Sequence, residues 1–331
     1  MDADALTAAR RGEWARLDEL SRRRRLGGAE ADELVTRYRA ASADLAELKT
    51  SAGRTPEGDY LSTLLARARL QLTGTPDNVL RQVPRFFLRQ LPAALYRLRY
   101  TTLVIAIGFV AVAALVAAWV ARDPVALASM GSQAQLEQYA ENDFTQYYSE
   151  NPAAVFAGMV WTNNAWIAAQ CVLFGITGLW PVMVLVQNAV GVGTSAAVLF
   201  AFDRGDVFLL HIAPHGLLEL TSIFVAGAAG LHIFWAWVAP GRRGRGEAVA
   251  AAGRSLATVA IGLVFALALS GLIEGFVTAQ PWPWPLKIGI GAAALAAFLV
   301  YMLVVGGRAY RRGETGDLTE YETGTPRLIA G

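Results

Sequence analysis

The stretch TTLVIAIGFVAVAALVAAWVA at residues 101–121 decides the fold. It contains no charged residue, and its length matches the roughly 20 apolar residues that an α-helix needs to cross a ~30 Å bilayer core. Further apolar windows of similar length follow at about 154–177, 180–202, 215–239, 255–279 and 286–306. The sequence therefore predicts an all-α fold, a polytopic membrane helix bundle of about six transmembrane helices within residues 101–306.

The overall composition also indicates a membrane protein. Of the 331 residues, 54% are hydrophobic and 17% are charged, whereas soluble domains have roughly 45–50% and about 25%. The net charge of +2 is too small to indicate a nucleic-acid partner. The only cysteine, Cys171, excludes an intrachain disulfide and a multi-cysteine metal site.

Two segments precede the predicted spans. Residues 1–77 show apolar positions near the 3.6-residue period and predict three short soluble helices. No signal peptide is expected there, because no apolar run is long enough. Residues 78–100 combine arginines with Phe and Leu, which predicts an amphipathic helix in the lipid headgroup plane. Its membrane-surface arginines are Arg81, Arg85, Arg89, Arg97 and Arg99.

The distribution of basic residues predicts the orientation of the chain. The connection at 241–254 and the tail at 307–331 are rich in Arg, whereas the long connection at 122–153 is acidic and aromatic. Arg and Lys accumulate on the cytoplasmic side of membrane proteins. We therefore expect a multi-pass plasma-membrane protein with both termini in the cytoplasm and the acidic loop outside.

Polar residues inside the predicted spans mark a candidate site, because ionisable groups are costly in a bilayer and need a partner or a function. Pro214 is expected to open the fourth span, and His215 and Glu219 then share one helix face at i and i+4. Glu274 falls at a similar depth on the fifth span. These three residues are candidates for one intramembrane polar cluster with Asn163, Asn164 and Asn188.

Three interpretations of this cluster stay open. Polar side chains can hydrogen-bond between membrane helices and fix their packing. Alternatively, His215, Glu219 and Glu274, with His211 as a fourth ligand, have donor atoms that suit zinc, although Pro214 interrupts the His211 face and no HExxH motif is present. Ionisable residues in spans also mark proton or solute pathways. We expect no cofactor, with a divalent metal as the alternative.

Short motifs along the chain point to a known family. The most specific are Pro214-His215-Gly216 with Glu219, and Ile273-Glu274-Gly275-Phe276. They are preceded, in order, by Trp14, Tyr38-Arg39, Asp44-Leu45-Ala46, Tyr60-Leu61 with Leu64, Asn163-Asn164, and Asn188 to Gly193. With these motifs the chain resembles the stage II sporulation protein M family of bacterial and archaeal membrane proteins.

The resemblance implies an envelope scaffold, because the family's namesake anchors two cell-wall-degrading partners in the membrane. We therefore expect a homo-oligomeric scaffold for envelope or cell-wall-remodelling partners rather than an enzyme. One alternative is a membrane-embedded metal-dependent hydrolase that uses His215, Glu219 and Glu274. Another is a transporter or channel with a proton-titrating site at Glu219 and Glu274.

Overall fold

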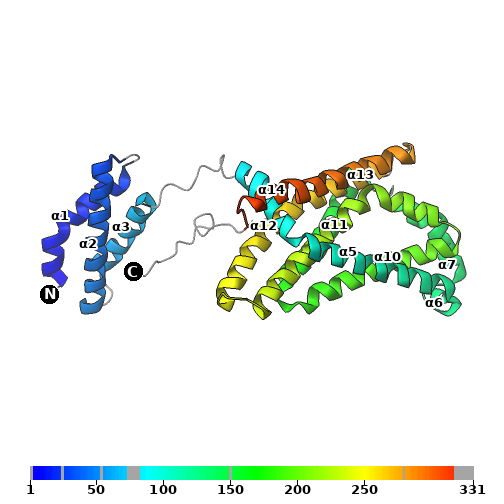
Figure 1. Cartoon of the computed structure of the whole chain (residues 1–331), viewed down its shortest axis with the longest axis horizontal. Helices are drawn as coiled ribbons and strands as arrows, with labels where there is room; N and C mark the ends of the chain where they lie inside the picture. The colour runs from blue at the N-terminus through cyan, green and yellow to red at the C-terminus, as the bar shows by residue number, and fades with distance from the viewer. Residues whose placement is uncertain are drawn as a thin grey trace. The chain divides into compact units, whose positions relative to one another are not determined.

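The computed structural model describes residues 3–23, 26–52, 55–72, 83–148, 151–278 and 280–316. These residues form helices and include no strand, which confirms the predicted all-α class. The chain divides into two compact units, residues 1–83 and 84–331 (Figure 1).

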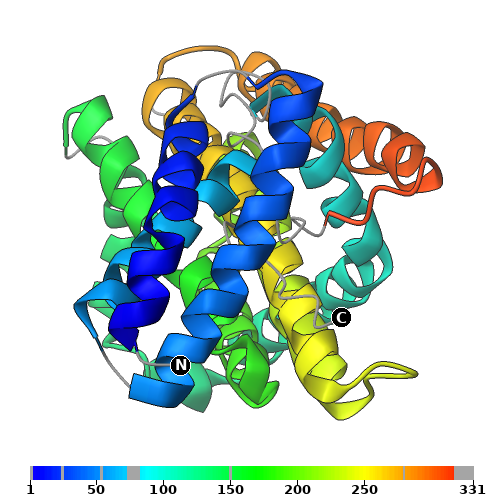
Figure 2. The ribbon, with the colours of Figure 1, turned by 90° about the vertical axis from the view of Figure 1, so that its left-hand side faces the viewer.

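The first unit consists of three helices, α1 (Ala3–Arg22), α2 (Gly28–Ala52) and α3 (Pro56–Leu72). α1 and α2 lie beside each other (Figure 2). Their apolar stripes, with that of α3, meet in a core that buries Leu17, Leu34 and Leu61 completely. The indole Nε1 of Trp14 donates a 2.9 Å hydrogen bond to Asp44, which joins α1 to α2 inside this core.

The second unit contains the long apolar helices. Helices long and apolar enough to cross a membrane cover Val83–Arg122, Leu179–Ala201, Gly205–Val238, Arg245–Thr278 and Trp284–Arg311. In these segments the α-helical parts are α5 (Leu91–Arg122), α10 (Leu179–Ala201), α11 (Gly205–Val238), α12 (Arg245–Ile273), α13 (Trp284–Val300) and α14 (Gly306–Arg311). π-helical turns at Phe86–Gln90, Glu274–Thr278 and Tyr301–Val305 connect to them. The helices pack lengthwise against one another (Figure 1).

A further long helix, α9 (Ala153–Leu173), contains more polar residues and is not among these five. It nevertheless extends between the two ends of the bundle. Near its start, the carbonyl oxygen of Ala157 would lie 2.9 Å from a Cβ added at Gly271, close to the end of α12. Near its end, Cys171 packs on Gly230 of α11, toward the opposite end of the bundle. α9 therefore runs antiparallel to α12, as a sixth helix of the bundle.

The segment predicted as an interfacial helix at 78–100 leads directly into the first membrane helix. Within the part of the chain that the structure describes, one helix continues without a break from Val83 to Arg122. The reason is packing: Leu91, Leu95 and Leu98 are buried in the bundle core rather than facing lipid headgroups. Part of the apolar face that was predicted to contact the membrane surface thus packs against other helices.

The connection between α5 and α9 folds over one end of the bundle. It contains α6 (Pro124–Ala128), α7 (Gln133–Gln138), a π-helical turn at Tyr139–Asp143 and α8 (Phe144–Gln146). Phe144 packs on Phe208 of α11, and the ring of Tyr148 lies 5.3 Å from that of His211. Burial raises the pKa of Tyr148 above its ordinary value, so this phenol stays neutral.

Pro214 does not open the fourth membrane helix, contrary to the prediction. It lies inside α11, which begins at Gly205 and has 34 residues, a length of about 51 Å at 1.5 Å per residue. Neighbouring helices allow proline in such positions because they pack around the distorted turn. Here Gly291 of α13 approaches so closely that a Cβ would overlap the backbone of Pro214. His211 and His215 are consequently one turn apart on one continuous helix.

Candidate intramembrane polar site

Three ionisable side chains meet between α11 and the π-helical turn that follows α12. One ligand atom from each of His215, Glu219 and Glu274 lies within 4.8 Å of the other two. The Nε2 atom of His215 is 3.6 Å from Oε1 of Glu274. His215 and Glu274 are each only 4% exposed, and Glu219 is partly buried. The i, i+4 spacing of His215 and Glu219 on α11 directs both toward Glu274.

Neighbouring polar groups hold the histidine ring in place. Its Nδ1 atom lies 3.3 Å from Oγ1 of Thr278. The hydroxyl of Ser270 donates a 3.1 Å hydrogen bond to the backbone carbonyl of His215. Lys287, in turn, donates a 2.7 Å hydrogen bond to the carbonyl of Thr278. Because Nδ1 is engaged with Thr278, Nε2 is the nitrogen that faces the carboxyl groups.

The π-helical turn Glu274–Thr278 contributes two of these groups. Both residues that bound the turn contact His215, one through each ring nitrogen. π-helical turns are rare and recur at functional sites, because they change the direction of side chains within a helix. In this chain the turn brings a carboxyl group and a hydroxyl group to opposite sides of one imidazole.

Two carboxylate oxygens in this group lack partners. The Oε2 atoms of Glu219 and Glu274 are shielded from solvent and accept no hydrogen bond from any described residue. An unsatisfied buried polar atom costs about 1–3 kcal/mol, and more when charged. The arrangement therefore has room for a proton or a cation.

The other sequence-predicted residues divide between this group and other sites. Asn164 is buried and lies beside the carboxyl group of Glu219, as Ser270 does. His211 is not part of the group: its Nδ1 donates to the carbonyl of Val207 at 2.8 Å, and its ring packs on Trp284 at 4.8 Å. Asn163 and Asn188 also lie elsewhere, in a pocket.

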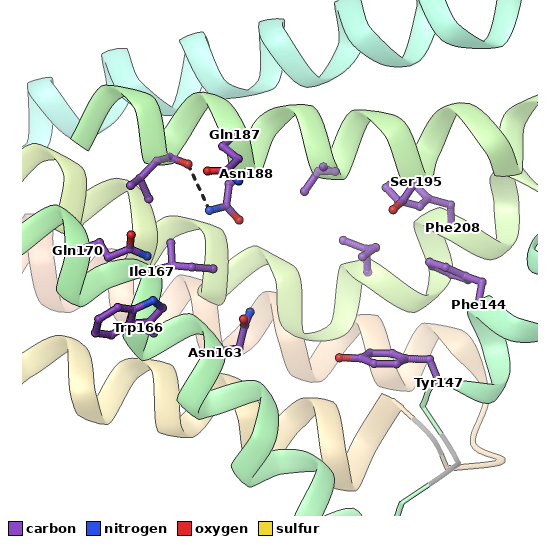
Figure 3. A pocket seen from close by; sticks show the side chains of 14 residues that line it. Phe144, Tyr147, Asn163, Trp166, Ile167, Gln170, Gln187, Asn188, Ser195 and Phe208 are labelled. Carbon is purple, nitrogen blue, oxygen red and sulfur yellow. Dashed lines mark hydrogen bonds between the residues drawn. The ribbon is translucent and has the colours of Figure 1, made fainter. Parts of the chain in front are cut away.

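This pocket, of about 610 Å³, lies between α9, α10 and α11 (Figure 3). Its uncharged polar lining consists of Asn163 and Gln170 from α9, and Gln187, Asn188 and Ser195 from α10. Phe144 and Tyr147 lie at one end, and Trp166 on the wall formed by α9 (Figure 3). We refer to it as the amide pocket.

The amides in this pocket differ in their hydrogen bonding. Asn188 donates to the carbonyl of Val184 at 3.3 Å, the dashed line in Figure 3, and Ser195 accepts a 3.4 Å hydrogen bond from Tyr139. Among the described residues, no partner is present for the side chains of Asn163, Gln170 and Gln187. Three neutral amides thus face a cavity in the apolar unit without a hydrogen-bond partner among the residues that the structure describes.

Gln170 and Trp166 are site residues that were not predicted from the sequence. The signal was present, because Asn163, Trp166 and Gln170 recur at intervals of three and four residues, which places them on one helix face. On α10, Asn188 and Ser195 are seven residues apart, about two turns, so they share one face, and Gln187 is adjacent to Asn188. Only the packing shows that the two stripes face each other.

Of the predicted membrane-surface arginines, Arg97 lies near the end of the bundle where α11 leads into α12. Arg97 donates a 2.9 Å hydrogen bond to the carbonyl of Thr315, and Arg99 lies 3.8 Å above the ring of Tyr96. Arg97 also lines a second pocket, of about 330 Å³, with Arg243 and Trp235. Arg85 and Arg89 lie on the helical turns before α5, and Arg81 lies outside the described residues.

The sequence of the membrane unit matches a known protein family. The sequence profile described as Stage II sporulation protein M matches residues 102–279, more than half of the chain. The chain belongs to the stage II sporulation protein M family. The matched region of this family member includes His215, Glu219, Glu274 and the amide pocket.

The N-terminal unit has a separate match. Residues 4–74 match a domain of unknown function, DUF8413, which covers α1, α2 and α3. Neither a curated protein nor a solved structure matches the chain. The family assignment and the apolar helices together establish a multi-pass membrane protein.

Proposed function

We propose that this member of the stage II sporulation protein M family is a membrane scaffold that holds envelope or cell-wall-remodelling partners. The amide pocket is the proposed docking site, and its ligand is a transmembrane helix of a partner that carries a polar side chain. The observation that carries the proposal is that Asn163, Gln170 and Gln187 have no hydrogen-bond partner within the described chain.

The environment of these amides explains why a helix would bind there. A polar group without a hydrogen bond in an apolar medium costs several kcal/mol. A lipid tail offers no donor or acceptor, whereas an Asn, Gln, Ser or Thr side chain on a neighbouring helix offers both. Trp166 and Phe144 on the pocket wall supply apolar area for the same helix. The pocket is therefore suited to an apolar helix with one or two polar residues.

Photo-crosslinking in the native membrane tests this proposal. A photoreactive amino acid at Gln187 lines the pocket, whereas the same amino acid at Val186, which is 44% exposed, does not. We expect Gln187, but not Val186, to crosslink to a peptide from an apolar segment that contains a polar residue. Asn163→Leu should abolish the adduct.

Other outcomes of the crosslinking experiment would contradict the proposal. Adducts with lipid alone would mean that the pocket faces the bilayer. A crosslink to a second copy of this chain would replace the partner helix by a homo-oligomer contact, which would instead support the predicted self-association. Equal crosslinking from Gln187 and Val186 would show that the pocket has no selectivity.

The hydrolase and the transporter are less well supported than the scaffold. Both require water or solute to reach His215, Glu219 and Glu274, yet the amide pocket is lined by none of these three residues. Both stay predictions. A flux into liposomes that Glu274→Gln abolishes would favour the transporter, and metal-dependent turnover of a peptide or ester would favour the hydrolase.

We also propose that both termini face the cytoplasm. Six antiparallel helices return the chain to the side on which it began, and the connection after α11 carries Arg242 and Arg243. Basic connections are retained on the cytoplasmic side. This orientation places the acidic connection between α5 and α9 outside, where envelope partners are located.

A further inference from the structure

We propose that His215, Glu219 and Glu274 bind one divalent transition-metal ion, with zinc as the best fit, inside the membrane unit. The ion would link α11 to the end of α12 and serve a structural role. This inference does not depend on the scaffold proposal, because the amide pocket shares no lining residue with the three ligands.

The spacing of the three side chains suits a single ion. Ligand atoms in a tetrahedral zinc site lie roughly 3.4 Å apart, given bonds of about 2.1 Å. The Nε2 atom of His215 and Oε1 of Glu274 are already 3.6 Å apart. All three ligand atoms lie within 4.8 Å of one another, so rotation of a glutamate side chain would bring them to bonding positions.

The surroundings of His215 match those of a metal-binding histidine. A ligating imidazole nearly always uses its second nitrogen for a hydrogen bond that fixes the tautomer and the ring orientation. Nδ1 of His215 faces the hydroxyl of Thr278 at 3.3 Å, and Nε2 faces the carboxyl groups. Thr278 is itself held through its carbonyl by Lys287. The ring is therefore oriented before any ion arrives.

The charge of the site also favours a divalent ion. Two carboxylates and a neutral imidazole carry a charge of −2, which a divalent cation cancels. The Oε2 atoms of Glu219 and Glu274, which lack partners among the described residues, supply further coordinating oxygens. A shared proton could join only one pair of oxygens. Uncompensated charge is costly in a low-dielectric interior. A divalent ion would cancel the charge of the two carboxylates and would also bind their unpartnered oxygens.

The ligand types select the metal. One nitrogen and carboxylate oxygens favour zinc and its first-row neighbours, whereas magnesium and calcium prefer sites made of oxygen alone. Three protein ligands leave one position of a tetrahedron open. Asn164, whose side chain lies beside Glu219, has an oxygen that could approach this position.

Elemental analysis of the full chain in detergent tests the site. The protein is stripped with a chelator, exposed to zinc and freed of excess ion, and metal is counted per chain. We expect one zinc in the wild type and a large loss of zinc in His215→Gln and Glu274→Gln. His232→Gln is the matched control on α11, because His232 lies outside the group and should retain the metal.

A second measurement keeps the proposal testable if a ligand variant does not fold. Thr278→Val preserves the shape of the residue but removes the hydroxyl beside Nδ1, and we expect roughly tenfold weaker zinc binding. Cobalt(II) in the wild type should give the intense visible absorption of a tetrahedral site. Wild-type protein that retains no zinc and gives no such cobalt spectrum would overturn the proposal, as would equal metal loss in His232→Gln.

Discussion

Nε2 of His215 and Oε1 of Glu274 lie 3.6 Å apart across the interface between α11 and the end of α12. The second oxygen of Glu274 and one oxygen of Glu219 remain buried without partners among the described residues. The interface between two apolar helices therefore contains buried carboxyl groups. The stability of this interface depends on the proton or cation that neutralises them.

Replacing the carboxyl groups of Glu219 and Glu274 should change the stability of the protein differently with and without bound metal. In chelator-treated protein, the double variant Glu219→Gln with Glu274→Gln should be at least as stable as the wild type, because no buried charge remains. With zinc added, the wild type should become the more stable protein. Thermal unfolding in detergent measures both. A double variant that is less stable in both conditions would contradict this.

Close helix packing predicts that a larger side chain at Gly230 strongly lowers the stability of the bundle. A Cβ there would overlap the carbonyl oxygen of Cys171 on α9, so Gly230→Ala should cost about 1–3 kcal/mol by forcing the two helices apart. Gly158 on α9 is the control, because nothing lies within 4 Å of an added Cβ. Gly158→Ala should be neutral or stabilise by about 0.5–1 kcal/mol. Equal thermal midpoints for the two variants would show that α9 and α11 are not packed this closely.

The N-terminal unit should lose an ion-pair contribution in acid. Hydrogen bonds from Arg16 and Arg37 lower the pKa of Glu33 to about 2, from an ordinary 4.5. A lowered pKa means that the contribution is fully present above about pH 4.5 and is lost as the pH falls through about 2. Because the Glu33 side chain is 30% exposed, and solvent therefore screens the ion pairs, we expect a modest effect.

Pepsin cleavage of the full chain tests this pH dependence. At each pH, the rate of cleavage within residues 3–52 is divided by that in Glu33→Gln, which cancels the pH dependence of pepsin itself. The wild type should be cleaved more slowly at pH 4.5, and the ratio should approach one near pH 2. A ratio independent of pH would mean that Glu33 makes no such contribution.

Single-cysteine labelling tests the proposed orientation. Cys171 is buried and is the only cysteine, so a Cys171→Ala background gives a clean starting point. An impermeant maleimide applied to spheroplasts should label Ala134→Cys in α7, which is exposed in the acidic connection. Gly246→Cys, at the start of α12, should react only after permeabilisation. The reverse pattern would place both termini outside.

The sequence by itself determined where the apolar helices lie and which family the chain belongs to. Runs of about 20 apolar residues specify membrane helices locally, because burying them in lipid needs no particular neighbour. The i, i+4 relation of His215 and Glu219 is likewise a property of one helix. The sequence also showed the polar residues that have to be explained, but not which of them meet.

Only the tertiary structure decided how those residues are grouped. Asn163 and Asn164 are adjacent in sequence, yet one lines the amide pocket and the other lies beside Glu219. Successive residues point about 100° apart on a helix, so the rotation of α9 assigns each to its site. That rotation is set where Gly271 and Gly230 let the backbone of α9 approach α12 and α11. Such contacts join residues far apart in the chain, and no local pattern records them.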